Sequence, residues 1–195
     1  MPIDRQQEVT RKAFHVAGII LIPIGRLDPL LVPGLLILLV ICYYAEEILA
    51  QQDRPVPGLS SLIRQAKRSD RKTRIDTGAF WLAAGVGLPY LFFPRPVAEI
   101  ALLLVCVADA AASLGPLYSP ELILKRLPHS QQKSWIGSAY FFVTAFACSV
   151  FYVSVGRALI IAAVGTVLES LPPRDIDNLT VPLGVAIFIG LMGWF

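Results

Sequence analysis

Seven long runs of apolar residues, separated by polar connections, dominate the pattern of this chain. They cover residues 9–27, 30–49, 77–93, 97–114, 135–155, 157–171 and 179–195. Helices of about 20 apolar residues cross a hydrocarbon core of roughly 30 Å, and several of these runs are near the short limit. The pattern predicts an all-α fold. We expect a polytopic integral membrane bundle of about seven transmembrane helices, or six and a re-entrant segment, forming a single membrane-embedded domain over residues 1–195.

The composition agrees with a membrane protein. Of the 195 residues, 55% are hydrophobic and only 16% are charged, and a soluble domain could not bury so much apolar surface. No small-residue cleavage site follows the first run, so we expect a retained helix rather than a signal peptide. The cysteines, Cys42, Cys106 and Cys148, lie inside apolar runs without metal-ligand spacing, which favours packing over disulfides.

The basic residues orient the bundle. With a cytoplasmic N-terminus and seven spans, 14 of the 17 Lys and Arg residues fall in cytoplasmic segments, and only Arg26, Arg95 and Arg157 fall outside. This distribution follows the positive-inside rule. The largest basic group lies in a cytoplasmic loop at about residues 51–76, where it sets topology and attracts anionic headgroups, or in part contacts a nucleotide. Residues 59–66 are expected to form a short interfacial helix.

Carboxylates near the membrane are concentrated on the cytoplasmic side. Only Asp28 and Glu99 fall toward the outer side, whereas the cytoplasmic group comprises Glu46, Glu47, Asp109, Glu169, Asp175 and Asp177. An ionisable group inside a span is costly unless it is paired, hydrated or bound to metal, so the asymmetry predicts one polar site at the inner face. Because Glu46 and Glu47 are about 100° apart on a helix, we expect only one to face the bundle.

Residues 109–138 hold the strongest candidate chemistry. Asp109 lies near the end of one apolar run and Lys133 just before the next. A carboxylate and a lysine at neighbouring helix mouths suit a metal ion and a phosphate chain. The alternative is a helix-end acid and a topology-setting lysine with no chemistry between them. His15, one turn past Arg11, is either a packed histidine or an active-site residue.

The start of the last apolar run adds to this site. Asp177, Asn178 or Thr180 is expected to cap the helix. Its free N–H groups and positive dipole end suit an anion at the cytoplasmic side. Capping explains one of these residues, whereas Asp177 and Asn178 together with Glu169 favour a site.

Four motifs in these segments resemble those of the CTP-dependent polyprenol kinases in order and spacing. They are Arg11-Lys12-x-Phe14-His15, Asp109-Ala-Ala-Ala-Ser113, Lys133-Ser134-x-x-Gly137-Ser138 and Asp177-Asn178-Leu-Thr-Val-Pro182-Leu183. That family includes dolichol kinase, phytol kinase and the fungal CTP-dependent diacylglycerol kinase. The resemblance spans nearly the whole chain. It implies an integral membrane enzyme that moves the γ-phosphate of CTP, with a divalent metal such as Mg²⁺, onto a dolichol- or polyprenol-like lipid alcohol at the cytoplasmic face.

Two places depart from the family pattern. The family usually continues its aspartate motif with two glycines spaced four apart, where this chain has Pro116 and Pro120, with Gly115 one position early. The lysine motif usually carries a glutamate where this chain has Ile136. If that glutamate binds metal or nucleotide, this chain has lost a ligand that another acid, Glu169 or Glu47, would have to replace.

The resemblance, together with phosphoryl-transfer chemistry, implies roles for the site residues. Catalysis is expected from Asp109, His15 and Lys133, with His15 or an acidic group accepting the proton of the lipid hydroxyl. The expected metal ligands are Asp109, Asp177 and Glu169. The expected nucleotide-binding residues are Arg11, Lys12, Lys133, Ser134, Gly137, Ser138 and Asn178.

Two other functions fit part of the pattern. A cytidylyltransferase would use the same acids and lysines to join a lipid phosphate to the α-phosphate of CTP, giving a CDP-lipid and pyrophosphate. A small membrane carrier would need ionisable groups near the midplane and an internal repeat, and we find neither. The expected partners are CTP and a membrane lipid, with no nucleic acid; a homodimer is compatible with the sequence. The expected location is the cell membrane of a prokaryote, or the endoplasmic reticulum or plastid membrane of a eukaryote.

Overall fold

The computed structural model describes residues 5–66, 77–118, 127, 133–171 and 176–195. Every regular element in these ranges is helical and none is a β-strand, so the all-α prediction is confirmed for them. The α-helices are α1 (Arg5–Ala17), α2 (Leu21–Leu27), α3 (Leu31–Gln51), α4 (Leu59–Ala66), α5 (Gly78–Phe92), α6 (Arg95–Leu103), α7 (Asp109–Leu114), α8 (Trp135–Ser149), α9 (Val155–Ser170) and α10 (Asp177–Leu191). Short elements join some of them, namely the 3₁₀ turns η1 (Gly18–Ile20) and η4 (Gly115–Tyr118) and the π-helical turn η3 (Leu104–Ala108).

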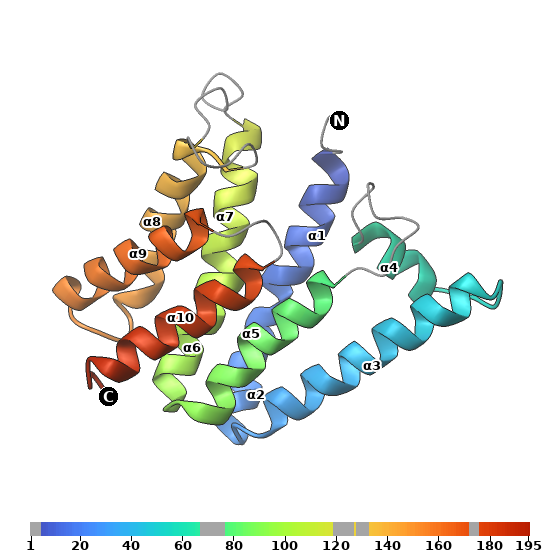
Figure 1. Cartoon of the computed structure of the whole chain (residues 1–195), viewed down its shortest axis with the longest axis horizontal. Coiled ribbons are helices and arrows are strands. Elements are labelled where there is room, and N and C mark those ends of the chain that lie inside the picture. The colour runs from blue at the N-terminus through green and yellow to red at the C-terminus, as the bar shows by residue number, and fades with distance from the viewer. Residues whose placement is uncertain (1–4, 67–76, 119–126, 128–132, 172–175) are drawn as a thin grey trace.

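A continuous helical rod, formed by α6, η3, α7 and η4, runs through the centre of the fold (Figure 1). It packs against α1, α5, α8 and α10, which surround it. Its buried residues are mostly small or branched and apolar, including Val97, Ala101, Leu104 and Ala108. Small side chains allow neighbouring helices to approach closely. The rod therefore fixes the position of Asp109, its only acidic residue besides Glu99 among those described.

Two helices in the described part of the chain are long and apolar enough to cross a membrane. They are α3 and the rod from Arg95 to Leu117. The helices α5, α8 and α10 are apolar but shorter. Each of the seven predicted apolar runs coincides with helical structure. The first run, residues 9–27, is covered by α1, η1 and α2 in succession. The seven-span topology and the cytoplasmic N-terminus stay predictions.

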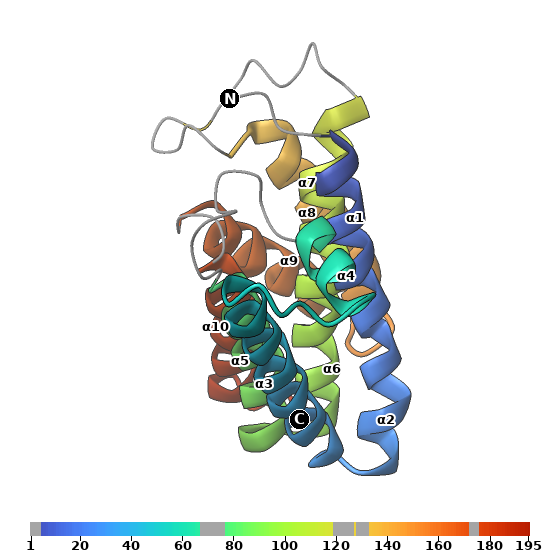
Figure 2. The ribbon, with the colours of Figure 1, turned by 90° about the vertical axis from the view of Figure 1, so that its right-hand side faces the viewer.

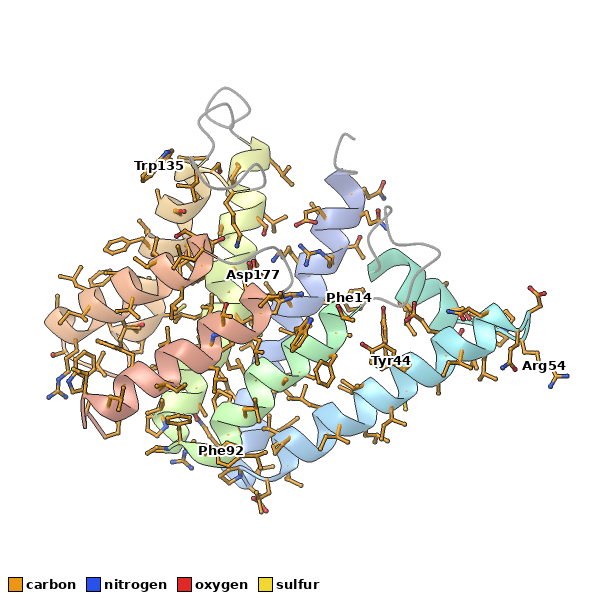
Figure 3. All side chains as sticks on the ribbon, viewed as in Figure 1. Phe14, Tyr44, Arg54, Phe92, Trp135 and Asp177 are labelled. Atoms are coloured by element: carbon orange, nitrogen blue, oxygen red, sulfur yellow. The ribbon has the colours of Figure 1, made fainter. Side chains whose placement is uncertain are left out.

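The first helix buries its charges and exposes its apolar residues. Glu8, Lys12 and His15 lie on the buried face of α1, whereas Phe14 is 45% exposed. Figure 3 shows apolar side chains projecting outward from α3 as well. The exposed apolar residues of α3 include Ile37, Leu38, Leu39 and Ile41. A polar inner face with an apolar outer face is the arrangement expected when lipid, rather than water, surrounds a helix.

The predicted interfacial helix at residues 59–66 is α4, which packs against α1 and α3 (Figure 2). Glu46, near the end of α3, accepts hydrogen bonds from the backbone N–H of Val56 at 3.1 Å and from the hydroxyl of Ser60. Both Glu46 and Glu47 are buried. Glu46 is covered by α4 and the residues before it, and the expectation that only one of the two acids faces the bundle stays a prediction. The basic residues 67–74, Pro120 and Asp175 lie outside the described residues.

Two glycines permit the close helix contacts that position the site. At Gly85, on α5, a Cβ atom would lie 2.0 Å from the backbone oxygen of Asn178 at the start of α10. At Gly137, on α8, a Cβ atom would lie 2.9 Å from the backbone oxygen of Ala112 on α7. Any side chain at Gly85 would therefore push α5 and α10 apart.

Glu99, near the start of the rod, joins three segments at the end of the fold away from Asp109. The guanidinium of Arg26 donates two hydrogen bonds to its carboxylate, at 3.0 and 2.8 Å. The hydroxyl of Tyr152, between α8 and α9, donates a third at 2.8 Å. This buried carboxylate is thus fully paired, and its role is to hold α2, α6 and the α8–α9 connection together.

Candidate active site

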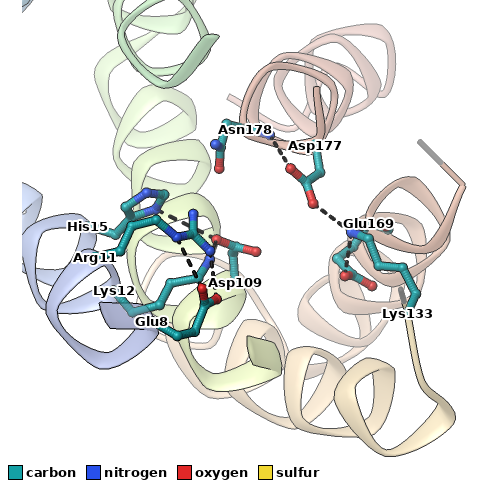
Figure 4. Close-up of polar contacts among 9 residues, drawn as sticks. All are labelled: Glu8, Arg11, Lys12, His15, Asp109, Lys133, Glu169, Asp177 and Asn178. Atoms are coloured by element: carbon teal, nitrogen blue, oxygen red, sulfur yellow. Dashed lines mark hydrogen bonds and ion pairs between the residues drawn. The ribbon is translucent and has the colours of Figure 1, made fainter. Parts of the chain in front are cut away.

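On one face of the site, side chains of α1 surround Asp109, the first residue of α7. Lys12 on α1 forms a buried hydrogen-bonded ion pair with the Asp109 carboxylate (Figure 4). His15, one turn later, brings Nδ1 to 3.6 Å from Oδ2 of Asp109. On the same face, Arg11 pairs with Glu8 through Nη2 and Oε1 at 2.6 Å. Lys12 and His15 are brought together by their helical spacing of three residues, as the motif at the chain's start predicts.

The π-helical turn η3 immediately precedes Asp109. Such a turn has one more residue per hydrogen-bonded ring than an α-helix and occurs frequently at functional sites. It rotates the following residues relative to a regular helix. The turn packs against α1, the helix that carries His15. Nδ1 of His15, which has no hydrogen-bond partner among the described residues, lies 3.6 Å from Oδ2 of Asp109.

The opposite face of the site is built around Lys133, just before α8. Its Nζ donates hydrogen bonds to Glu169 Oε1 at 2.7 Å, to the Glu169 backbone oxygen at 2.6 Å and to Asp177 Oδ2 at 2.6 Å. Burial alone lowers the pKa of Lys133, but the charges of Asp177 and Glu169 outweigh it and raise this pKa above the usual lysine value. Lys133 is therefore a cation at neutral pH.

The two faces lie opposite one another across the interior. Figure 4 shows Asp109 and its partners on one side and Lys133, Glu169 and Asp177 on the other, with Asn178 beside Asp177. Glu169 is close enough to Asp109 for their charges to interact. The structure thus brings together side chains from all four sequence motifs, which come from α1, α7, the start of α8 and the start of α10.

Several polar atoms inside this region have no hydrogen-bond partner among the described residues. They are Nδ1 of His15, Oγ of Ser138, Oε2 of Glu169 and Oγ1 of Thr180. Buried polar atoms are nearly always paired in native proteins, so such a group calls for a ligand, ion or water. His15 and Glu169 are 6% and 5% exposed, so bulk solvent does not satisfy them.

Ser134 and Gly137, expected to bind nucleotide, have structural contacts in this state. The hydroxyl of Ser134 accepts a hydrogen bond from the backbone N–H of Gly137 at 3.2 Å and so caps α8. Gly137 lies against Ala112 of α7. Ser138 is buried beside them. Their nucleotide-binding role stays a prediction.

The start of α10 differs in detail from the sequence expectation. The helix begins at Asp177, and Ile176 is the capping residue without any side-chain hydrogen bond. Neither Asp177, Asn178 nor Thr180 is therefore the cap. The reason is that the Asp177 carboxylate lies between two other donors, accepting from Lys133 and from the backbone N–H of Asn178 at 3.0 Å.

The expected metal ligands are near one another but do not form a ready-made cluster. Within the described ranges, no group of three or more His, Cys, Asp or Glu side chains is placed to hold a metal ion. Glu169 and Asp177 share Lys133, whereas Asp109 is paired with Lys12. The shared metal at Asp109 and Asp177 stays a prediction.

Glu8 is the site residue that the sequence reasoning missed. It is buried, and it neutralises Arg11 beside the Lys12–Asp109 pair. The signal was available, because Glu8 lies three residues before Arg11 and four before Lys12, which places all three on one helix face.

The chain is similar to three plant phytol kinases. It is 28% identical over 148 residues to phytol kinase 1, chloroplastic, of Arabidopsis thaliana, a match covering 66% of this chain and 47% of that protein. It is 24% identical over 151 residues to a probable phytol kinase, chloroplastic, of Triticum aestivum, covering 68% of this chain and 49% of that protein. It is 26% identical over 147 residues to probable phytol kinase 1, chloroplastic, of Oryza sativa subsp. japonica, covering 65% of this chain and 46% of that protein.

The match spans about half the length of these curated relatives. No family model matches the chain, and no solved structure matches it. The similarities support the family of polyprenol and phytol kinases. They do not support its dolichol kinase or fungal diacylglycerol kinase members in particular.

Proposed function

We propose that this chain is a CTP-dependent kinase that transfers the γ-phosphate to an isoprenoid alcohol of the phytol or polyprenol type. The observation that carries the proposal is the facing pair of buried lysines: Lys12 is held by the carboxylate of Asp109, and Lys133 by those of Glu169 and Asp177. The phytol kinase relatives support the same class of reaction. They favour a phytol-like acceptor over dolichol.

The positive side chains are suited to hold the triphosphate. Phosphoryl transfer is mainly positioning and charge neutralisation. Lys12 and Lys133 approach the site from opposite faces, and Arg11 lies next to Lys12. We assign these three to the phosphates, and Asn178 with the segment from Ser134 to Ser138 to the rest of CTP.

A divalent cation such as Mg²⁺ fits the acidic residues opposite Lys12. Glu169 and Asp177 offer carboxylate oxygens, and Oε2 of Glu169 is buried without a hydrogen-bond partner among the residues described. Mg²⁺ in nucleotide enzymes usually takes one or two carboxylates, with phosphates and water completing the shell. Asp109 faces these two acids as the third ligand of the set. When bound, the ion neutralises charge on the phosphate oxygens.

His15 is placed to accept the proton of the lipid hydroxyl. In the transfer, the alcohol oxygen bonds to the γ-phosphorus, the bond from that phosphorus to the β–γ bridging oxygen breaks, and CDP leaves. The proton of the alcohol passes to Nδ1 of His15, the ring nitrogen without a hydrogen-bond partner. Asp109, 3.6 Å from that nitrogen, stabilises the imidazolium that forms.

The proposal includes an integral membrane location with the site at the cytoplasmic face. The exposed apolar residues of α1 and α3 and the two long apolar helices support membrane embedding. An isoprenoid tail can then lie along the outer apolar surface while only its hydroxyl reaches Asp109 and His15. The acceptor alcohol, the nucleotide and a homodimeric state belong to the same proposal.

The decisive experiment follows the label of CTP. Purified protein is incubated with Mg²⁺, a panel of alcohols (phytol, geranylgeraniol, polyprenol and dolichol) and CTP labelled at either the γ- or the α-phosphate. We expect γ-label in the lipid, with phytol or geranylgeraniol preferred, and no α-label. Transfer of α-label to added lipid phosphate would instead identify a cytidylyltransferase. Absence of label in any lipid, with ATP and GTP also tested, would overturn the kinase proposal.

A further inference from the structure

Three oxygen atoms surround the Lys133 ammonium in a buried cage. They are Oε1 and the backbone oxygen of Glu169 and Oδ2 of Asp177, at 2.7, 2.6 and 2.6 Å from Nζ. The end of α9 supplies the two Glu169 oxygens and the start of α10 supplies the Asp177 oxygen, so these two helix ends meet at the Lys133 ammonium. Lys133 is itself only 6% exposed.

This set of oxygens is the kind that binds a hard divalent cation. Such ions take carboxylate and backbone carbonyl oxygens at about 2.0–2.6 Å, which is slightly shorter than the distances from Nζ. The second carboxylate oxygen of Glu169, Oε2, is buried and has no hydrogen-bond partner among the described residues, so the cage has an unused ligand atom. Lys12, by contrast, forms an ion pair with a single carboxylate among the residues that the structure describes, that of Asp109.

We propose that Lys133 is a placeholder cation, occupying in the nucleotide-free protein the position that a divalent metal takes once nucleotide phosphates draw the lysine side chain away. This inference rests on the proposed function, because it assumes that phosphates bind here. Lys133 then has two successive partners, the carboxylates first and the phosphates second. When the lysine moves to the phosphates, the negative charge of the cage needs a metal ion, and the positive charge of the lysine needs the phosphates. Metal and nucleotide therefore bind synergistically.

The variant Lys133→Met tests this idea without any catalytic readout. Methionine keeps the length and apolar stem of lysine but removes its charge, so the two buried carboxylates lose the ammonium that both of them contact. We expect the variant to bind Mn²⁺ in the absence of nucleotide at one site per chain, at least roughly a hundredfold more tightly than the wild type. Electron paramagnetic resonance of Mn²⁺ measures the affinity, and thermal unfolding with and without Mn²⁺ measures the accompanying stabilisation.

Two matched variants serve as controls. Lys12→Met removes the other buried lysine but leaves a single carboxylate, so it should gain little Mn²⁺ affinity. The double variant Lys133→Met/Asp177→Asn removes one carboxylate from the cage and should lose most of the gain. If Lys133→Met binds Mn²⁺ no better than either control, the placeholder role is wrong.

Folding of the variant is handled by a second substitution. If Lys133→Met does not fold without metal, Lys133→Gln is measured instead, because its neutral amide can still donate hydrogen bonds to the cage while the carboxylates of Glu169 and Asp177 both stay available to the ion. Its melting temperature should still rise with Mn²⁺, unlike that of Lys12→Met. No rise in this variant overturns the inference.

The outcome is independent of kinase activity. A cage that gains Mn²⁺ in Lys133→Met while the wild type transfers no phosphate would retain the cation site and reject the proposed function. A wild type that phosphorylates phytol while Lys133→Met gains no Mn²⁺ affinity would retain the proposed function and reject the cation site.

Discussion

Lys12 and Lys133 are not surface lysines that merely set topology. Each is buried, each meets carboxylates that lie far away in the sequence, and together they line the two faces of one site. A buried ammonium without a partner is strongly unfavourable, so removing the carboxylate partner of either lysine would destabilise the fold. The same pairs leave the site rich in both signs of charge, which suits a metal–triphosphate complex better than either ion alone.

The carboxylates of Asp109 and Asp177 should act as one unit in catalysis. Asp109→Asn and Asp177→Asn are each expected to lower kcat by roughly a hundredfold or more, because each removes charge that positions phosphate and metal. The double variant should be little worse than either single variant, since residues acting as a unit are strongly non-additive. Steady-state kinetics at saturating Mg²⁺ measures this.

Asp53→Asn is the matched control for these two substitutions. Asp53 is exposed, and its positive φ of 58° is one that Asn also tolerates. The kcat of the Asp53→Asn variant should equal that of the wild type. Losses at Asp109 and Asp177 that simply multiply, or substantial activity in both single variants, would contradict a shared function.

The motif residues could be predicted from the sequence, but their partners could not. Lys12 and Asp109 are separated by 97 positions, and no local periodicity relates residues that far apart. Ser134 shows a different limit, because a serine before an apolar run is also the ordinary signal of a helix cap. The structure assigns it that contact, and sequence reasoning had weighed only its motif.

At the scale of helices, close contact between α5 and α10 holds Asp177 and Asn178 in place. Gly85→Ala would put a Cβ atom 2.0 Å from the Asn178 backbone oxygen, and that oxygen belongs to the rigid start of a helix. We expect a loss of about 1–3 kcal/mol in the free energy of unfolding, with a larger fall in activity than in stability. Thermal unfolding in detergent and the CTP assay measure the two effects.

Gly34→Ala provides the comparison for this prediction. A Cβ atom at Gly34, on α3, would meet nothing within 4 Å, so alanine should leave activity unchanged and raise stability slightly through helix propensity. Equal behaviour of the two alanine variants would mean that the α5–α10 contact does not position the site.

The positions of the helices were predictable because their apolar runs are long and uninterrupted. The π turn at Leu104–Ala108 was not, since it changes the hydrogen-bonding register without changing composition. The burial of both Glu46 and Glu47 could not be predicted for a related reason. Helical periodicity describes a helix alone, whereas here α4 returns to cover a second side of α3.

In the whole molecule, the central rod carries one buried acid toward each end. Glu99 and Asp109 are ten residues apart, or about 15 Å along a helix. Glu99 is fully paired with Arg26 and Tyr152, and the Arg26 side chain is 57% exposed. Around Asp109, by contrast, the lysine is buried and His15 keeps an unpaired nitrogen. The end at Glu99 therefore holds helices together, whereas the end at Asp109 has the side chains of the candidate active site.

The seven-span topology makes a prediction about these two ends. In a variant lacking Cys42, Cys106 and Cys148, a single cysteine is introduced at Gln52 or at Gly156, both of which are exposed. Gln52 follows α3 in the loop at 51–76 that is predicted to be cytoplasmic, and Gly156 lies at the start of α9 beside the connection predicted to be outside. The positive-inside distribution then requires that an impermeant maleimide label Gln52→Cys only from the cytoplasmic side and Gly156→Cys only from the other. Sealed vesicles of both orientations supply the comparison. If both cysteines react from the same side, an odd number of crossings between residues 52 and 156 is excluded, and the site at Asp109 can no longer be assigned to the cytoplasmic face on the charge pattern.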